Sequence, residues 1–343
     1  MKILITGGCG FVGSNLSLYL KRNLNNSQIF TIDNFTRPGS KIRYNILKLK
    51  NIRNFNIDIS NYEKVMNLPR FDLIIDCCAE AAVADSIKKP KKVFDTNLIG
   101  TFNIINKCKK DKSDIIFLST SRVYSINLFK KKINLSNIKK KKLNKFSVNE
   151  SFDTDGRKSL YGFTKLSSED LIKEYSYSDK IRYIINRFGV ISGPWQFGHE
   201  DQGFVSLWII SHFLKKNLKY IGFGGKGLQM RDVLHIDDAC EIILLQIKKI
   251  NLIYNQTFNI GGGIRNLISL KKLTNLCENI TKNKIKFTQV KKTSIFDIPI
   301  FLTNNAKIKK YYKWKPKKKM DLIIKDIYTW TIKYKKIIKK VFL

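Results

Sequence analysis

Three closely spaced glycines constrain the fold of this chain more than any other feature. The apolar run KILIT at residues 2–6 is followed by Gly7, Gly10 and Gly13, and then by the helical pattern FVGSNLSLYLKRN. Gly7 permits a tight turn, Gly10 lets the backbone approach a ligand, and Gly13 lets a helix pack closely on the strand. The start of that helix presents unpaired N–H groups, so the turn predicts a phosphate seat, although the spacing alone is equally consistent with a structural turn.

Short apolar strands alternate with helical patterns through the first half of the chain. The expected strands are QIFTID (28–33), NFNID (54–58), DLIID (72–76) and DIIFLST (114–120), and helical patterns cover 93–110 and 159–176. This alternation predicts an α/β fold of the Rossmann type, a doubly wound parallel sheet with helices on both faces and right-handed crossovers.

The second half of the chain is less regular and predicts a smaller α/β lobe. We expect a dinucleotide-binding domain over 1–190, with 228–256 returning to it, and a substrate-binding lobe over 191–227 and 257–343. The lysine-rich stretch 126–149 lacks clean periodicity and is expected to be a surface insertion.

A carboxylate follows the second predicted strand. Asp33 stands 20 positions after Gly13, where a carboxylate can hold both ribose hydroxyls of an adenosine and would repel a 2′-phosphate. The chain is therefore expected to bind NAD rather than NADP. Two alternatives remain: Arg37 could bind a 2′-phosphate, and Asp33 could have only a turn-forming role. Asp58, which ends the third strand, could cap a loop or reach the adenine.

Tyr161 and Lys165 stand four residues apart in SLYGFTK and would share one face of a helix. A nearby ammonium, together with an oxidised nicotinamide, would stabilise a phenolate and lower the tyrosine pKa from about 10. Tyr161 would then be a usable base near neutral pH.

These motifs together resemble the extended short-chain dehydrogenase/reductase family, in its NAD-dependent epimerase/dehydratase branch. The resemblance covers nearly the whole chain and is carried by TGGCGFVGS, DTNLIGT (95–101), LSTSRVY (118–124), YGFTK (161–165), RDVLHIDD (231–238) and FNIGGG (258–263). It implies that Thr120 holds the substrate oxygen that Tyr161 deprotonates. It also implies cofactor contacts from Gly7, Gly10, Phe11, Val12, Gly13, Asp33, Asn34, Arg37, Asp58, Ile59, Ala79, Asn97, Tyr161, Lys165 and Phe188.

Within that family the later segments most resemble the CDP-paratose 2-epimerases. WQFGHEDQGFVSLW (195–208) and GGKGLQMRDVLH (224–235) carry this resemblance, which implies nucleotide-sugar contacts from Gln196, Asp201, Gln202 and Arg231. An arginine fork suits a diphosphate, but Arg231 could instead pair with Asp232 or Asp237. Val190 stands where many relatives have a substrate-contacting asparagine, and Glu80 adds a carboxylate at the end of the fourth strand.

The residues after Thr120 favour epimerisation over loss of water. Dehydratases of the family follow the threonine with an Asp-Glu pair, whereas this chain has Ser121 and Arg122. We expect a nucleotide-sugar epimerase that forms a transient keto sugar and returns the hydride, acting at C2 of a CDP-sugar or elsewhere. The alternatives are a UDP-sugar 4-epimerase or another NAD-dependent enzyme of the family, such as a decarboxylase, and a nucleotide- or RNA-binding protein that kept the fold.

The composition argues against a membrane span and a signal peptide, and it gives only weak support to a nucleic-acid partner. The net charge of +37 invites a nucleic-acid partner, but the excess is almost all lysine, clustered in 126–149 and 307–340, and is expected to be a solvated surface. No apolar run reaches 18 residues, and MKILITGG is too short for a signal peptide. We expect a cytoplasmic homodimer with six reduced cysteines, no membrane span and no metal site.

Overall fold

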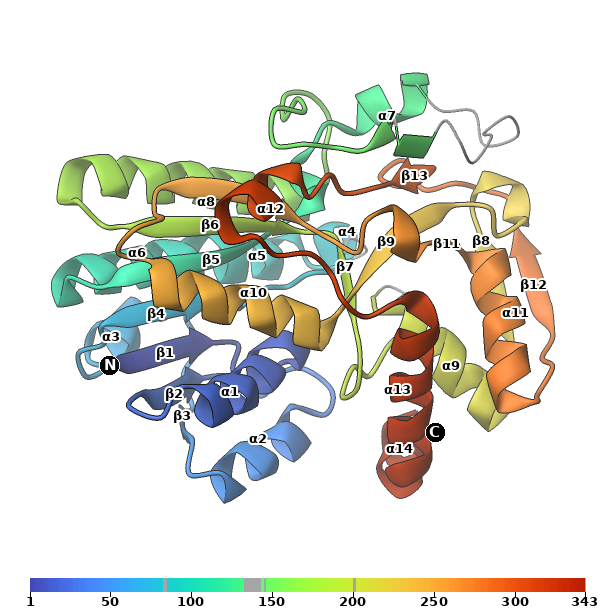
Figure 1. The fold of residues 1–343 in the computed structure, drawn as a ribbon, viewed down its shortest axis with the longest axis horizontal. Helices are drawn as coiled ribbons and strands as arrows, with labels where there is room; N and C mark the ends of the chain where they lie inside the picture. Colours follow the sequence, from blue (N-terminus) through green and yellow to red (C-terminus); the bar gives the residue numbers. More distant parts are fainter. Residues whose placement is uncertain (83–84, 133–142, 145, 200–201, 343) are drawn as a thin grey trace. The chain divides into compact units, whose positions relative to one another are not determined.

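The computed structural model describes residues 1–82, 85–132, 143–144, 146–199 and 202–342, and the chain divides into two compact units. Unit 1 comprises Met1–Val123, Ser159–Arg187 and Cys240–Phe258, and unit 2 comprises Tyr124–Lys158, Phe188–Ala239 and Asn259–Leu343 (Figure 1). The stretch 124–158, assigned to the first domain from the sequence, thus clusters with unit 2. Residues 133–142 and 145 of the lysine-rich stretch lie outside the described residues.

The central sheet has seven strands in the order β10-β6-β5-β4-β1-β2-β3, and the strand pairs β1–β2, β2–β3, β1–β4 and β4–β5 are parallel (Figure 1). The strands are β1 Lys2–Thr6, β2 Gln28–Ile32, β3 Arg53–Phe55, β4 Leu73–Asp76, β5 Asp114–Thr120, β6 Tyr183–Phe188 and β10 Gln256–Ile260. The predicted parallel α/β sheet is therefore confirmed. β3 ends three residues before Asp58, because that carboxylate accepts hydrogen bonds from Ser60 and turns the chain there.

Alternating side chains place helices on both faces of this sheet. Leu4 and Ile185 join a core cluster with Ile104 of α6 and Ile172 of α8, so their neighbours in the strands face the other side. On that side α1 packs on β1 and β2, and Asn186 of β6 exchanges hydrogen bonds with Gln246 of α10. The helices are α1 Phe11–Asn23, α2 Ser40–Leu49, α3 Tyr62–Met66, α4 Asp85–Lys88, α5 Pro90–Phe94, α6 Gly100–Asp111, α8 Leu160–Asp179 and α10 Ile236–Lys249.

The helical pattern predicted over 93–110 is one continuous run with a change of pitch. A π-helical turn, η1 Asp95–Ile99, separates α5 from α6 and carries Asn97. Turns of this kind are frequent at functional sites because the extra residue re-aims a side chain. A 3₁₀ turn, η2 Ser121–Val123, directly follows β5.

Unit 2 has its own sheets and core. Strands β7 Val190–Ser192, β9 Met230–His235, β11 Leu267–Ser269 and β13 Ile300–Phe301 form one sheet, and β8 Leu218–Ile221 pairs in parallel with β12 Phe287–Val290. The helices are α7 Ile126–Lys132, α9 Phe204–Leu214, α11 Leu270–Thr281, α12 Ala306–Tyr312, α13 Met320–Lys333 and α14 Lys335–Phe342, with 3₁₀ turns η5 Phe223–Gly225 and η6 Ile264–Asn266. Among the described residues, none of the helices combines the length and apolarity that crossing a bilayer requires.

Candidate active site

The glycine-rich turn after β1 is closed by its own backbone. The Gly10 N–H donates to the Gly7 carbonyl at 2.8 Å, and Gly7 has a φ of +58°. A Cβ on Gly13 would lie 2.3 Å from the same carbonyl oxygen, so only glycine permits this approach of α1. Gly10 is the N-cap of α1 and has no side chain to cap it, which leaves the first N–H groups of the helix, those of Phe11 and Val12, available to an anion.

The carboxylate of Asp33, directly after β2, lies against this turn. It accepts hydrogen bonds from the backbone N–H groups of Cys9 at 2.9 Å and Phe35 at 2.8 Å. Burial raises the pKa of Asp33, while those N–H groups and the Arg43 guanidinium act against the rise. Asp33 is thus tied to the glycine turn, as a ribose-binding carboxylate must be.

Arg43 is a residue that the sequence analysis missed. It lies in α2, is 4% exposed, and donates from Nε to the Cys9 carbonyl at 2.6 Å. Its burial could have been predicted from its position, because Ser40, Arg43 and Leu47 are spaced three and four residues apart and form the buried face of α2. An arginine on an inward face needs buried partners, and here they are the Cys9 carbonyl and the Asp33 charge.

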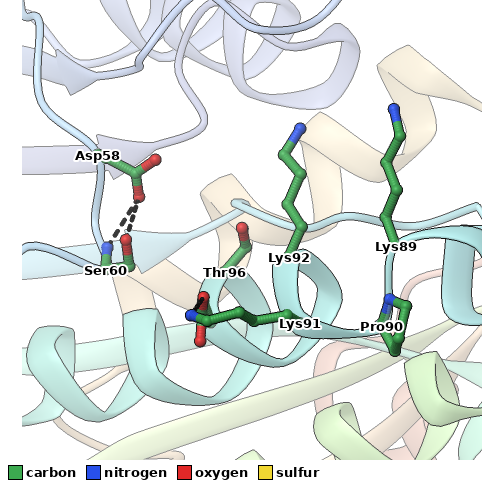
Figure 2. Close-up of a pocket in the computed structure, with 8 residues that line it drawn as sticks. Asp58, Ser60, Lys89, Pro90, Lys91, Lys92 and Thr96 are labelled. Carbon is green, nitrogen blue, oxygen red and sulfur yellow. Dashed lines mark hydrogen bonds and ion pairs between the residues drawn. The ribbon is translucent and has the colours of Figure 1, made fainter.

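Asn34 and Asp58 meet beside a pocket of about 440 Å³. The Asn34 amide donates to Asp58 Oδ2 at 2.7 Å, and Ser60 donates to Oδ1. Burial opposes the charge of Asp58, but the bonds from Ser60 and Asn34 outweigh it and hold its pKa below the ordinary value. Figure 2 shows Asp58 and Ser60 facing three lysines of the pocket, whose lining is Asp58, Ser60, Lys89, Pro90, Lys91, Lys92, Asp95 and Thr96.

Asn97 braces the loop after β4. Its amide accepts from the Glu80 N–H at 2.8 Å and donates to the Glu80 carbonyl at 3.2 Å. The Ala79 carbonyl of the same loop accepts from Arg37 at 3.5 Å. Ile59 is 3% exposed and its side chain lies against Gly100 of α6. The candidates at the carboxyl edge of the sheet therefore fall into two sets. One set is the hydrogen-bonded pair of Asn34 and Asp58. The other is Arg37, Ala79 and Asn97, which meet at the loop after β4.

The Thr120 side chain, at the end of β5, faces the Tyr161 hydroxyl, at the start of α8. Ser86, a further residue that the sequence analysis missed, accepts from the Tyr161 N–H at 3.1 Å and fixes the start of that helix. Burial raises the pKa of Tyr161, whereas the Thr120 hydrogen bond and the charges of Arg122 and Arg37 lower it. In the protein alone the net direction is therefore upward, opposite to the expected lowering.

The Lys165 ammonium is buried and has no hydrogen-bond partner among the residues that the structure describes. Its side chain is 1% exposed, and Nζ lies 3.9 Å from the centroid of the Phe117 ring. Burial lowers its pKa, and the nearby acid Asp76 acts against that. Lys165 is not among the groups that act on the Tyr161 pKa, because its ammonium is directed elsewhere. An orphaned buried cation of this kind calls for a ligand.

Of the candidate substrate residues, Thr120 lies in unit 1, and Gln196, Gln202 and Arg231 lie in unit 2. Arg231 donates to Asp297 at 2.7 Å and to the Ile298 carbonyl at 2.7 Å, so the structure gives it an ion pair with Asp297, an acid that the sequence analysis did not consider. The Gln196 amide oxygen accepts from Ser192 and Ser206, and its Nε2 donates to the Ile191 carbonyl.

Three further candidates take different positions. Gln202 is exposed and pairs through its backbone with His199. Asp201 lies outside the described residues. Phe188, at the end of β6, is 4% exposed and is the first residue of the second segment of unit 2.

Comparisons with known proteins agree on the family. Residues 3–261 match the NAD dependent epimerase/dehydratase family. The chain is 30% identical to the CDP-paratose 2-epimerase of Salmonella typhi over 96% of this chain and 99% of that protein. It is 24% identical to UDP-glucuronate 4-epimerase 4 of Arabidopsis thaliana over 97% of this chain and 75% of that protein.

Solved structures share the fold over the whole chain. UDP-glucose 4-epimerase of Thermotoga maritima superposes with a TM-score of 0.81 at 24% identity, covering 97% of this chain and 99% of that one. UDP-glucuronic acid 4-epimerase of Bacillus cereus, solved with UDP-glucuronic acid and NAD, has a TM-score of 0.81 at 23% identity and covers 100% of both chains. On the family match and the 30% relative, this chain belongs to the NAD-dependent epimerase/dehydratase family.

Proposed function

We propose that this chain is an NAD-dependent epimerase of a nucleotide sugar, which oxidises one sugar hydroxyl transiently and returns the hydride. The observation that carries the proposal is that the Thr120 side chain faces the Tyr161 hydroxyl and is followed in the chain by Ser121 and Arg122 in place of carboxylates. One hydroxyl can hold a substrate oxygen while the other exchanges a proton with it.

Unit 1 is the part of the chain to which we assign NAD, and its free polar groups fit that cofactor. The uncapped start of α1 suits a pyrophosphate, Asp33 suits the adenosine ribose, and the unpartnered Lys165 ammonium suits the hydroxyls of the second ribose. When bound, NAD supplies a hydride acceptor that can later give the hydride back. We assign nucleotide-sugar contacts to unit 2, where Arg231 and Gln202 are the first candidates.

Tyr161 Oη is the atom that takes the proton from the reacting sugar hydroxyl. Burial makes its phenolate costly in the protein alone, so the reaction depends on the groups that oppose this cost. Thr120 donates a hydrogen bond, and the charges of Arg122 and Arg37 favour the phenolate. Thr120 also holds the sugar oxygen, so that proton transfer occurs between oriented groups. The keto sugar then rotates in the site. The hydride returns to the other face of the carbonyl carbon, and Tyr161 returns the proton to the oxygen.

Loss of water is disfavoured by the side chains beside Thr120. Elimination needs one group to remove a proton from carbon and another to protonate the departing hydroxyl. Neither Ser121 nor Arg122 carries a carboxyl group that could serve as that acid or base. A reaction in which Tyr161 first takes and then returns one proton needs neither group.

CDP-paratose, or a closely related CDP-sugar, is our first candidate substrate. The support is the 30% identity to a CDP-paratose 2-epimerase that the chain matches from end to end. A UDP-sugar 4-epimerase is the second candidate, supported by relatives of that activity at lower identity.

We also propose a homodimer. Ile99, Phe102 and Phe163 are 37%, 36% and 48% exposed on helical segments that pack together, namely η1, α6 and α8. Exposed apolar side chains grouped on adjacent helices are typical of a surface that a second copy covers.

The test begins with the protein as purified. Nucleotide released on denaturation is identified by mass spectrometry, and the protein is then incubated with CDP-, UDP-, GDP- and dTDP-sugars in deuterated water. Bound NAD and an inverted product without deuterium support internal hydride return. Deuterium on carbon would instead indicate exchange of a carbon-bound proton and would contradict the proposal.

A variant pair tests the assigned base. Tyr161→Phe should lower turnover by roughly 10² to 10⁴-fold, the usual contribution of a positioned general base. The control is Tyr177→Phe on the same helix, because that side chain is 89% exposed and should not affect turnover. Full activity of Tyr161→Phe would rule out the mechanism.

A further inference from the structure

Glu80 holds two cations from different elements. Its Oε2 lies 2.7 Å from Arg37 Nη2, and its Oε1 lies 2.8 Å from Lys92 Nζ. The Glu80 side chain is 7% exposed, Arg37 is 28% exposed and Lys92 is 44% exposed. A carboxylate this buried is stable only because both oxygens are paired. The pairing also shows that Arg37 is engaged by Glu80 and does not contact Asp33.

The Arg37–Glu80 ion pair spans the end of β1. Arg37 lies in the loop after β2 and Glu80 in the loop after β4, and β1 lies between β2 and β4 in the sheet. All three strands are parallel, so their carboxyl ends meet at one edge. The ion pair therefore connects the two loops across the glycine turn, which follows β1.

The two sides of this connection differ in how firmly they are held. Glu80 is anchored through its backbone N–H and carbonyl by the fully buried Asn97. Arg37 lies between two left-handed backbone positions, Phe35 with a φ of 58° and Gly39 with a φ of 75°. Such positions are usual where a short segment turns sharply. Arg37 is therefore carried by a short, sharply turned loop segment, whereas Glu80 is anchored to the helical turn of Asn97.

We propose that Glu80 is a positioning residue that holds Arg37 across the glycine turn, so that this ion pair must open each time the dinucleotide enters or leaves. The proposal rests on NAD binding at the glycine turn, as stated under the proposed function. An ion pair that is formed in both the free and the loaded protein must open for entry and for exit, so it slows both and changes rates more than affinity.

The alternative role for Arg37 makes the opposite prediction. If Arg37 served mainly to bind the cofactor phosphates, Glu80 would compete with them for the guanidinium. Removing the Glu80 charge would then free Arg37, tighten binding and slow release. The sign of the change in release rate on Glu80→Gln therefore separates the two roles.

The experiment measures exchange of NADH in a stopped-flow instrument by its fluorescence. Protein loaded with NADH is mixed with excess NAD for the release rate, and free protein with NADH for the association rate. For Glu80→Gln we expect both rates to rise by about tenfold, with the dissociation constant changed by less than about twofold. Added salt should accelerate exchange in the unchanged protein and have little effect on the variant.

Two further variants complete the test. Arg37→Met should give the same increase, and the double variant should exchange no faster than either single one. Asp170→Asn, which removes the exposed 2.8 Å pair with Lys173 on α8, is the matched control and should leave both rates unchanged. Slower or unchanged release from a folded Glu80→Gln protein overturns the proposal. Failure of the unchanged protein to bind NADH would instead count against the proposed function itself.

Discussion

Gly13→Ala is the substitution whose effect follows most directly from the coordinates. The added Cβ would lie 2.3 Å from the Gly7 carbonyl oxygen and 2.9 Å from both the Gly7 carbonyl carbon and the Gly8 Cα. Ordinary contact begins at 3.4 Å, so the start of α1 must retreat by about 1.1 Å, the difference between 3.4 and 2.3 Å. All three contacts are with backbone, which cannot rotate away. Overpacking of this kind costs about 1 to 3 kcal/mol of folding free energy.

The same retreat moves the N–H groups that would face the cofactor phosphates. A misplacement of about 1 Å can cost on the order of 10²-fold in a positioned contact, so we expect NADH affinity to fall by at least about tenfold. Urea unfolding gives the stability change and fluorescence titration gives the affinity. The control is Asn23→Ala at the exposed end of α1, which shortens an exposed side chain and places no new atom against the backbone. A Gly13→Ala protein with unchanged stability and affinity would refute the reasoning.

Three further predictions follow from charges and exposed surface. Arg122→Met removes a cation that lowers the Tyr161 pKa, so the acidic limb of the kcat/KM profile should move to higher pH; an unmoved limb would contradict this. Burial lowers the pKa of His235 to about 4, with Asp237, Lys318 and Asp326 facing the ring, so the unfolded chain alone takes up its proton between pH 6.5 and 4. Stability should therefore fall by about 3 kcal/mol across that window, and less in His235→Asn, as urea unfolding at each pH would show. Phe102→Asp should convert a dimer to a monomer in sedimentation, provided α6 forms the interface.

Much of unit 1 could be predicted because its signals are local. The apolar runs at 2–6, 73–76 and 114–120 are buried on both faces, and a strand of that kind reads the same in sequence as in structure. The run at 54–58 was less informative, since Phe55 is the last paired residue of an edge strand and hydrogen bonds around Asp58 end it. The π-helical turn at Asp95–Ile99 was not predictable either, because it keeps a helical pattern of side chains.

The candidate site could be predicted where a sequence motif identifies the residues. It was harder to predict where the role of a side chain depends on which residue it pairs with. Thr120 and Tyr161, 41 positions apart, were paired from motifs and face each other in the structure. The ion pair of Arg231 with Asp297 was not predicted, because Asp232 and Asp237 lie nearer to Arg231 in the sequence and were considered first. Proximity along the chain is a weak guide to the partner of a long side chain.

The two acids at the sheet edge show that the role of a carboxylate depends on the residues around it in the fold, which the sequence does not reveal. Asp33 and Glu80 each follow a parallel strand and each meets an arginine from another segment, Arg43 and Arg37 respectively. A carboxylate left unpaired at this depth would raise its pKa and lose its charge, and with it the ability to hold a ribose hydroxyl or a guanidinium. Arg43 thus opposes the rise in the Asp33 pKa that burial causes, and Arg37 forms an ion pair with Glu80 at the same edge of the sheet. Arg43 donates to the Cys9 carbonyl within the turn, whereas Arg37 joins two loops across it, and this second pair is the one that we propose must open for the dinucleotide.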